Sequence, residues 1–385
     1  MLRLTTRKAQ SISSADRSIE RAVARSVFPS DRECPTATDD ASLDWYHHWL
    51  QERIEQLPSA VTKRIRSFPA VFCKVAVLTK SKCSINEIAA SLPRSDMLET
   101  PDTDDDRRLL TCVVFALLGW QTMLYEPALG IAPPQQLAVA DVLDGFSSQA
   151  LTSLKQDCSQ ARRSLPDFLL GFGLMLPRGN LCMSEDHDER DAFEKTAVVG
   201  SRDLNAALLH SLARVTIKWV DVMAPHLELD KATNTLFLYR YPSFCLANIQ
   251  PYDGVGNRGV IHGCAAGNDS PSEWACEAEV TQLLGEIILS YRLLFGQSKA
   301  SRRLFQPKTA FGSGAPKAQD AFLTRLCSDG FVALPASCNE RDVYRLSRDF
   351  PVLRNRIAIL CQHLSNVKPR GWRDIWKDKR HSAQW

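Results

Sequence analysis

Apolar residues recur every three or four positions through long stretches of this chain, and that spacing places them on one face of a helix. The clearest stripe consists of Val280, Leu283, Ile287, Tyr291 and Leu294. A similar stripe between residues 43 and 57 predicts an earlier helix that starts at Ser42 and ends near Pro58. Such stripes are stable only when they are buried, so we expect a mainly α protein with a multi-helix globular body.

Two further segments bear on the middle of the chain. The first is an apolar run that predicts a helix of six turns, capped by Ser201 and central to the core. Its members are Leu204, Leu208, Leu212, Val215, Trp219 and Val222. The second, TNTLFLYRYPSFCLANI, is rich in aromatic and branched residues and contains Pro242, so it predicts two short strands or an extended pair. These strands are the short β element of the expected fold.

A winged-helix-like unit is expected nearer the N-terminus. Ser84 and Glu87 match a capping box at the start of a short helix, and a third helix is expected from about Asp105. Short helix, turn and third helix resemble a helix-turn-helix or winged-helix unit. Beyond Arg108, however, the third helix reads LLTCVVFALLGW and brings no Arg, Asn or Gln to base edges. We therefore expect the run from Leu109 to Trp120 to be a buried core helix and expect no nucleic-acid partner.

Charge and cysteine usage constrain the environment of the protein. The 47 Lys/Arg and 44 Asp/Glu give a net charge of +3, too small to favour nucleic acid over the whole surface. The 12 cysteines are scattered singly without a CxxC pair, and several, such as Cys112 and Cys361, lie inside apolar runs. They indicate buried, reduced thiols of a cytoplasmic protein and argue against a disulfide framework or a zinc site. The N-terminus lacks the apolar segment of a secretion signal.

Composition shifts divide the chain into five predicted parts. We expect a disordered, basic and Ser-rich tail over residues 1–40, a small helical unit over 41–130, and a helical core with the short β element over 131–311. GSGAPKAQ predicts a linker over 312–320, and C-terminal helices with a basic, Trp-rich arm are expected over 321–385.

Motifs for catalysis or cofactor binding are weak. Gly254, Gly256 and Gly259 spell GxGxxG, but a dinucleotide site needs a helix that opens at the third glycine, and VIHGCAAGND follows instead. His262 and Cys264 lie two residues apart in the same loop, and could be a base and its nucleophile only if other groups oriented them. The sequence therefore predicts no catalytic residue, no cofactor and no metal site.

The last 18 residues, KPRGWRDIWKDKRHSAQW, combine three tryptophans with six Lys/Arg. On a helix, two of the tryptophans lie four positions apart on one face, with basic residues beside them. Indole favours the boundary between apolar and polar phases, and Lys/Arg are attracted to anionic lipid. The segment could instead be a packed terminal helix with solvated charges. The predicted membrane-surface residues are Trp372, Arg373, Trp376, Lys377, Arg380 and Trp385.

Four blocks of this sequence resemble an uncharacterised family of filamentous-ascomycete proteins. They are LLTCVVFALLGWQTMLYEP, LYRYPSFCLA, EIILSYRLLFGQSKASRRLF, and DFPVLRNRIAIL with PRGWRDIWKDKR. The likeness covers roughly residues 105–385 and carries no catalytic residues across. In that family the tryptophan-rich block usually runs into a hydrophobic segment typical of a membrane anchor, and this chain departs from the pattern by ending at Trp385. The resemblance implies a membrane-facing end and favours a juxtamembrane collar at the terminal block.

Three functions follow from these patterns. We expect first a non-catalytic, cytosol-facing protein that is membrane-associated or a scaffold, with an anionic membrane surface as its partner. The second is an enzyme or small-molecule-binding accessory protein of fungal specialised metabolism that uses the loop over residues 253–269. The third is winged-helix binding to nucleic acid. A polar pocket around His262 and Cys264 would favour the second, and an exposed basic helix near Arg107 and Arg108 would favour the third.

Overall fold

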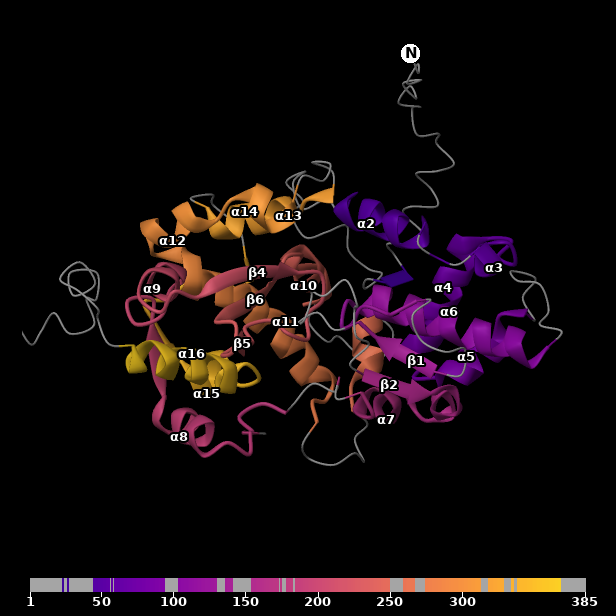
Figure 1. Ribbon diagram of the computed structural model, residues 1–385, viewed down its shortest axis with the longest axis horizontal. Helices are drawn as coiled ribbons and strands as arrows, with labels where there is room; N and C mark the ends of the chain where they lie inside the picture. The colour runs from indigo at the N-terminus through magenta and orange to yellow at the C-terminus, as the bar shows by residue number, and fades with distance from the viewer. Residues whose placement is uncertain are drawn as a thin grey trace, which may run out of the picture.

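The protein is mainly α with a few short strands, as predicted (Figure 1). The computed structural model describes residues 23, 26–27, 44–55, 57, 59–93, 103–129, 136–140, 154–172, 174, 178–182, 184–249, 259–266, 274–312, 318–328, 334–335 and 338–367. All six predicted membrane-surface residues and most of the predicted linker lie outside these ranges. Within the predicted tail, Val23 and Val27 are described, and both are buried in the core. The five-part division of the chain stays a prediction.

The first part of the described chain forms helices and one antiparallel strand pair. The helices are α2 (Asp44–Glu55), α3 (Ser59–Thr62), α4 (Phe68–Lys80), α5 (Ile85–Ser91), α6 (Asp104–Thr122), the 3₁₀ helix η2 (Cys158–Arg162) and α7 (Leu165–Leu170). The strands are β1 (Gln136–Val139) and β2 (Leu154–Asp157). These elements gather on the right of Figure 1, where η2 packs on both α5 and α6.

The second part contains two small sheets and the remaining helices. The helices are α8 (His187–Lys195), α9 (Ala206–Ser211), α10 (Pro242–Asn248), the 3₁₀ helix η3 (Val260–Cys264), α11 (Glu277–Tyr291), the π-helical turn η4 (Arg292–Gly296), α12 (Lys299–Leu304), α13 (Pro307–Phe311), α14 (Ala321–Cys327), α15 (Leu346–Asp349) and α16 (Arg354–Asn366). Strand β3 (Val198–Gly200) pairs antiparallel with β7 (Val343–Arg345). In the three-stranded sheet, β6 (Thr235–Tyr239) lies between parallel β4 (Thr216–Val220) and antiparallel β5 (Leu229–Asp230).

The predicted capping box at Ser84 is confirmed. The Ser84 hydroxyl accepts from the Glu87 backbone N–H at 3.2 Å, and Glu87 accepts from the Ser84 N–H at 2.7 Å. A second capping box, formed by Thr103 and Asp106, opens α6. From Val113 to Thr122 every residue of α6 is buried, so this apolar run is the core helix that the sequence predicts. Among the described residues, we find no helix with the length and apolar character that a bilayer crossing requires.

The predicted six-turn helix after Ser201 is wrong. Only α9 forms there, capped by Asn205 and not by Ser201, and the chain then turns at Arg214, whose φ of 58° is left-handed. Beyond this turn, residues 216–220 form strand β4. The apolar spacing allowed either structure, and backbone pairing of β4 with β6 decided for the strand because it satisfies the N–H and C=O groups across the sheet.

The predicted β element is half correct. Residues 235–239 form β6 as expected, but the following segment forms helix α10 with Pro242 at its first position. Proline suits that position because its ring fixes a helical φ and its missing N–H has no partner in a first turn. The same residue that argued against a helix therefore starts one.

The clearest apolar stripe of the sequence is confirmed as α11, and its last member, Leu294, lies in the π-helical turn η4 that follows. This helix lies between the two groups of elements in Figure 1 and contacts α10 and η3. Segment η3 in turn packs on α4 so closely that a Cβ at Gly263 would lie 2.3 Å from the carbonyl oxygen of Thr79. Glycine is required there by backbone proximity, and the contact joins the two groups.

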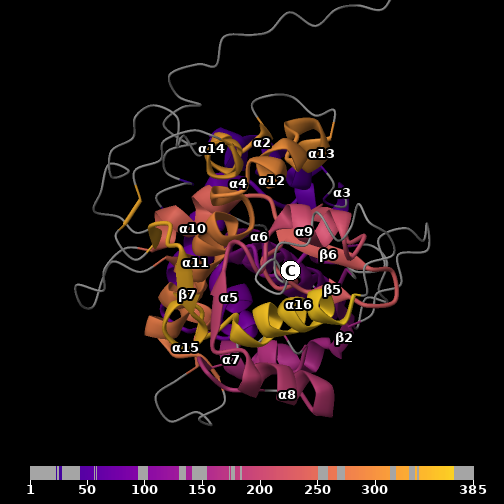
Figure 2. The ribbon, with the colours of Figure 1, turned by 90° about the vertical axis from the view of Figure 1, so that its left-hand side faces the viewer.

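A buried glutamate side chain of α11 holds the start of α16. Leu353, at the N-cap of α16, has no side chain that can cap a helix. Glu286 supplies the acceptors instead, taking the N–H of Val352 at 3.1 Å and that of Leu353 at 2.7 Å. Helix α16 then lies along α8 (Figure 2).

Replacing Glu286 by Gln should destabilise the protein. A Gln side chain presents one oxygen and one NH₂ group, so one of the two buried backbone N–H groups loses its acceptor. We expect the free energy of unfolding to fall by roughly 1–3 kcal/mol in urea denaturation. The matched control is Glu194→Gln, which changes an exposed glutamate of α8 and should leave stability within about 0.5 kcal/mol of the wild type. Equal stability of both variants would contradict the capping role.

Candidate functional site

A group of paired charges lies at one edge of the three-stranded sheet. Asp221 directly follows β4, and Arg240 directly follows β6. Because the two strands are parallel and Val220 pairs with Tyr239, both side chains leave the sheet at the same edge. The carboxyl ends of parallel strands are where α/β proteins commonly place ligand-binding groups.

Helix α2 brings two further side chains to this edge. Trp49 and Arg53 lie one helical turn apart and both reach the Asp221 carboxylate, the indole N–H at 3.2 Å and the guanidinium Nη2 at 2.8 Å. Arg240 contacts the other oxygen of Asp221 through Nε at 2.7 Å. Arg53 also contacts Glu126 through its own Nε at 3.1 Å. We call Trp49, Arg53, Glu126, Asp221 and Arg240 the Asp221 cluster.

The cluster is partly buried, and its two guanidiniums face two carboxyl groups. The side chains of Arg53 and Glu126 are 18% and 22% exposed, and those of Arg240 and Asp221 are 24% and 21% exposed. Burial raises the pKa of Glu126 to about 7, an effect that the Asp221 charge reinforces and Arg53 opposes. Glu126 can therefore gain or lose a proton near neutral pH, while both guanidiniums have carboxylate partners.

A second polar joint ties the same helix to the C-terminal half. The indole N–H of Trp45 donates to the Ser243 hydroxyl at 2.7 Å, and its ring stacks on Tyr241 at 4.0 Å. Asp320 accepts the Ser243 N–H and the Phe322 N–H, each at 2.9 Å, and so receives donors from the starts of α10 and α14. Burial raises the pKa of Asp320 to about 6. These contacts position the helices, and the polar groups of Trp45, Ser243 and Asp320 have hydrogen-bond partners within the chain.

His226 and Ser290 have the spacing of a catalytic pair but not its chemistry. His226 Nε2 lies 2.9 Å from the Ser290 hydroxyl, and its Nδ1 accepts the Tyr239 backbone N–H at 3.1 Å. Because Nδ1 is an acceptor, the ring proton is on Nε2, which cannot then take a proton from the serine. Burial lowers the pKa of His226 to about 3, so the ring stays neutral. The pair is a buried structural link.

The two residues singled out in the predicted loop are also part of the core. His262 and Cys264 are both buried in η3, where His262 Nε2 lies 3.0 Å from the Thr281 hydroxyl. Burial raises the pKa of the Cys264 thiol to about 12, which leaves no thiolate for nucleophilic attack near neutral pH. Gly254 and Gly256 of the GxGxxG pattern lie outside the described residues, and Gly259 immediately precedes η3.

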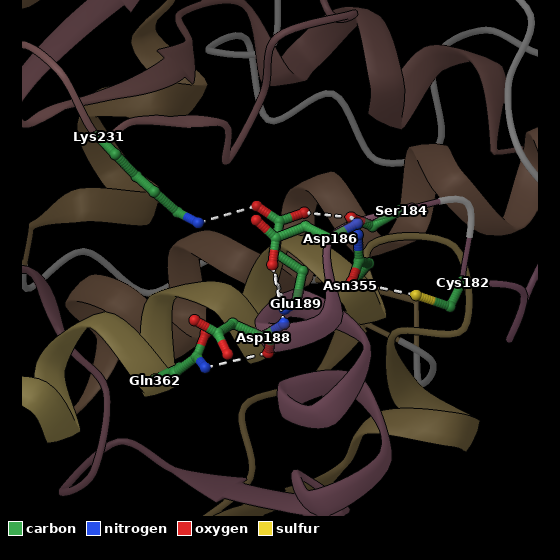
Figure 3. A network of polar contacts seen from close by, with 8 residues as sticks. All are labelled: Cys182, Ser184, Asp186, Asp188, Glu189, Lys231, Asn355 and Gln362. Carbon is green, nitrogen blue, oxygen red and sulfur yellow. Dashed lines mark hydrogen bonds and ion pairs between the residues drawn. The ribbon is translucent and has the colours of Figure 1, made fainter.

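An exposed acidic network surrounds the start of α8 (Figure 3). Glu189 accepts from the Ser184 hydroxyl at 2.7 Å and from Lys231 at 2.9 Å, and the Gln362 amide donates to the Asp188 carbonyl at 3.0 Å. The network fastens α8 to the β5–β6 turn and to α16. Within the part of the chain that the structure describes, no three or more His, Cys, Asp or Glu side chains are placed to hold a metal ion.

No protein-family model, curated protein or solved structure matches this chain. The Asp221 cluster, which the sequence analysis missed, therefore stands on its geometry. Two signals pointed to it: the pair Trp49 and Arg53 at helical spacing, and a charged residue directly after each strand segment. The predicted membrane-surface residues Trp372, Arg373, Trp376, Lys377, Arg380 and Trp385 all follow Val367, the last described residue, so the structure relates none of them to this cluster.

Two isosteric substitutions in the cluster should have different costs. Asp221→Asn leaves two partly buried guanidiniums facing a neutral amide, and we expect a loss of roughly 2 kcal/mol in the free energy of unfolding. At pH 6 Glu126 is mostly protonated, so Glu126→Gln should cost less than about 1 kcal/mol. Urea denaturation of both variants at pH 6 measures the difference. Equal losses would show that Glu126 is ionised there.

Glu126 should make the stability of the protein depend on pH. The folded protein holds this proton up to about pH 7, while the unfolded chain releases it near the usual value of 4.5. The folded state thus binds more protons between these values, and Glu126 makes stability fall as the pH rises from 4.5 to 7. Glu126→Gln should lack this part of the fall when unfolding is followed across that range. A wild-type slope in the variant would contradict the raised pKa.

Proposed function

We propose that this protein is a non-catalytic scaffold at the cytosolic face of a membrane, which contacts anionic lipid through its terminal arm, residues 368–385. The observation that carries the proposal is the content of that arm, with six Lys/Arg and three Trp against two acids. The arm follows directly on α16, a helix that Glu286 and α8 fasten to the body. A contact made by the arm would therefore tether the whole folded body.

Electrostatics and indole partitioning would both contribute to this contact. Each Lys or Arg near an anionic surface contributes on the order of 1 kcal/mol, and the attraction decays over a Debye length of roughly 8 Å at physiological salt. Tryptophan adds a salt-independent part because its ring prefers the interfacial region. The expected binding is thus weak and sensitive to salt.

The described body supports a structural role. Three buried or partly buried acidic side chains serve as joints: Asp221 connects α2 to the sheet, Asp320 connects α10 to α14, and Glu286 connects α11 to α16. Asp320 and Glu286 accept backbone N–H groups, and Asp221 pairs with the guanidiniums of Arg53 and Arg240. Such joints fix the relative positions of elements, which is what a scaffold requires of its core.

An enzyme or small-molecule-binding accessory protein that uses residues 253–269 is the runner-up. The expected discriminator was a polar pocket around His262 and Cys264, and both residues are buried against neighbouring helices. Because burial keeps the Cys264 thiol protonated, these two residues give the catalytic alternative no support. It therefore ranks below the scaffold.

The winged-helix alternative rests on the order of α4, α5 and α6 followed by the β1–β2 pair. Its discriminator was an exposed basic helix near Arg107 and Arg108. Both side chains are exposed, but each is paired with an acid of the same helix, Asp104 at 2.8 Å and Asp105 at 3.3 Å. An acidic first turn repels phosphate, so we propose that any winged-helix likeness is one of packing and not of nucleic-acid binding.

Binding to lipid vesicles tests the proposal. The intact protein should co-sediment with vesicles of phosphatidylcholine and phosphatidylserine, and more strongly at low salt than at physiological salt. The triple variant Arg373→Gln, Lys377→Gln, Arg380→Gln should flatten the salt dependence, because it removes three charges near the surface. The double variant Trp372→Ala, Trp376→Ala should weaken binding but keep the salt dependence.

A matched control removes the same charge elsewhere. Lys299, Arg303 and Lys308 are exposed on α12 and α13, and replacing all three by Gln should leave vesicle binding unchanged. Loss of binding in this control equal to that of the arm variant would assign the effect to net charge. Failure of the intact protein to bind anionic vesicles at low salt would overturn the membrane proposal.

A further inference from the structure

Helix α8 turns one side to the body and presents acidic side chains on the other. Ala192 and Phe193 are buried, whereas Glu185, just before the helix, and Asp188 and Glu194 within it are exposed. Residues three positions apart lie close together on a helix surface, and these three acids follow that spacing or a multiple of it. We call Glu185, Asp188 and Glu194 the α8 acidic face.

The charges of the α8 acidic face have no lysine or arginine partner within the described part of the chain. Two other acids of this helix, Glu189 and Asp191, pair with lysines at 2.9 Å and 2.7 Å. The face itself has only His187, whose Nδ1 lies 4.0 Å from Asp188 and which carries a charge only when protonated. Three like charges are therefore available to attract a cationic group.

The terminal arm begins beside this face. Helix α16 runs antiparallel to α8: the guanidinium of Arg354, its first residue, lies 4.0 Å from the centroid of the Phe193 ring near the end of α8. About two turns later, the Gln362 amide donates to the Asp188 carbonyl at 3.0 Å, near the start of α8 (Figure 2). The last described residue, Val367, is five residues further along, so the arm leaves the body next to the acidic face.

The α8 segment and the terminal arm have opposite charges. Residues 185–195 contain six acidic and two basic side chains, and the terminal arm contains six basic and two acidic ones. An extended arm of 18 residues reaches roughly 60 Å, while α8 is about 14 Å long, so length imposes no limit on contact. Tethering also raises the local concentration of the arm into the millimolar range, at which even a weak ionic contact is populated.

We propose that the α8 acidic face binds the terminal arm of the same molecule in the absence of a membrane. The Lys and Arg side chains of the arm then pair with carboxylates of α8 and cannot face anionic lipid at the same time. The apparent affinity for lipid is thereby reduced in proportion to the fraction of molecules whose arm is free. This consequence rests on the lipid contact proposed above, whereas the docking itself requires only the two oppositely charged segments.

Zero-length cross-linking of the full-length protein tests the docking without lipid. A water-soluble carbodiimide forms an amide between a carboxylate and a lysine amine only where the two groups are in contact. Lys368 is close to α8 through the chain itself, so Lys377 and Lys379 are the informative lysines. After trypsin digestion we expect links from these two lysines to peptides 179–190 and 191–195, which carry the acidic face. Absence of such links would overturn the proposal and leave the face to a separate basic partner.

Salt and isotope labelling define the nature of the contact. The links should become several-fold weaker at about 1 M salt, where the Debye length is roughly 3 Å, because an ionic contact is screened and a chain tether is not. In a mixture of isotope-labelled and unlabelled protein, the links should join peptides of the same label. Links that ignore salt would reduce the contact to mere proximity, and links between labels would place the arm on a second copy. Either result contradicts the proposal.

Vesicle binding measures the consequence of docking. The triple variant Glu185→Gln, Asp188→Asn, Glu194→Gln removes the acidic face and should lose most of the cross-links. It should also bind vesicles that contain phosphatidylserine roughly threefold to tenfold more tightly than the wild type, because the arm is then free in nearly every molecule. All three positions are exposed, so the variant should keep the wild-type fold. Unchanged vesicle affinity together with unchanged cross-links would contradict the assigned face.

A matched control removes the same charge from α2, which lies away from α8 in Figures 1 and 2. Its substitutions are Asp44→Asn, Glu52→Gln and Glu55→Gln, all at exposed positions. Distant surface charges are largely screened, so vesicle affinity should stay within about twofold of the wild type. An equal gain in this control would assign the effect to net charge and overturn the masking of the arm. Cross-links without vesicle binding would refute the lipid contact alone, and vesicle binding without cross-links would refute the docking alone.

Discussion

The carboxylate of Asp221 is the contact on which the arrangement of this protein depends most. It lies at the carboxyl edge of the β4–β6 pair, is only 21% exposed, and requires partners there because an unpaired carboxylate in such a place is costly. Arg53 and Trp49 supply them from α2, and Arg240 supplies another from the end of β6. One charge thereby fixes the position of an N-terminal helix on a sheet formed more than 160 residues later.

Two more deeply buried acidic side chains also hold elements of the fold in place. Glu286 and Asp320 are nearly inaccessible to solvent, and each accepts N–H donors at the beginning of a helix that could not otherwise satisfy them. Helix dipoles and donor groups favour a negative charge at these points, while burial disfavours it and raises both pKa values. The joints are therefore specific in geometry, and they suit a body whose proposed task is to hold a shape beneath a lipid-binding arm.

Local patterns predicted the parts of the fold that depend on neighbours in sequence. The apolar stripe of α11, the capping box at Ser84 and the buried run of α6 all needed only residues within one or two helical turns. The Asp221 cluster could be predicted only in fragments, as two helical neighbours and two strand ends. The packing of η2 on α5 and α6 left no sequence signal, because it depends on contacts between residues that are far apart in the sequence.

By itself the sequence determined the helical class, the interior character of α6 and the charge and aromatic content of the terminal arm. Tertiary structure decided the rest. The stretch from Val215 to Val222 has a spacing that fits a helix, yet residues 216–220 form a strand because β6 was available to pair with them. Pro242 could end a strand or begin a helix, and the chain takes the second course, where α10 packs on α11. Apolar periodicity shows which side chains can share a face of a helix or strand. Long-range pairing decides which backbone N–H and C=O groups find a partner. Where the periodicity fits both a helix and a strand, the backbone pairing decides between them.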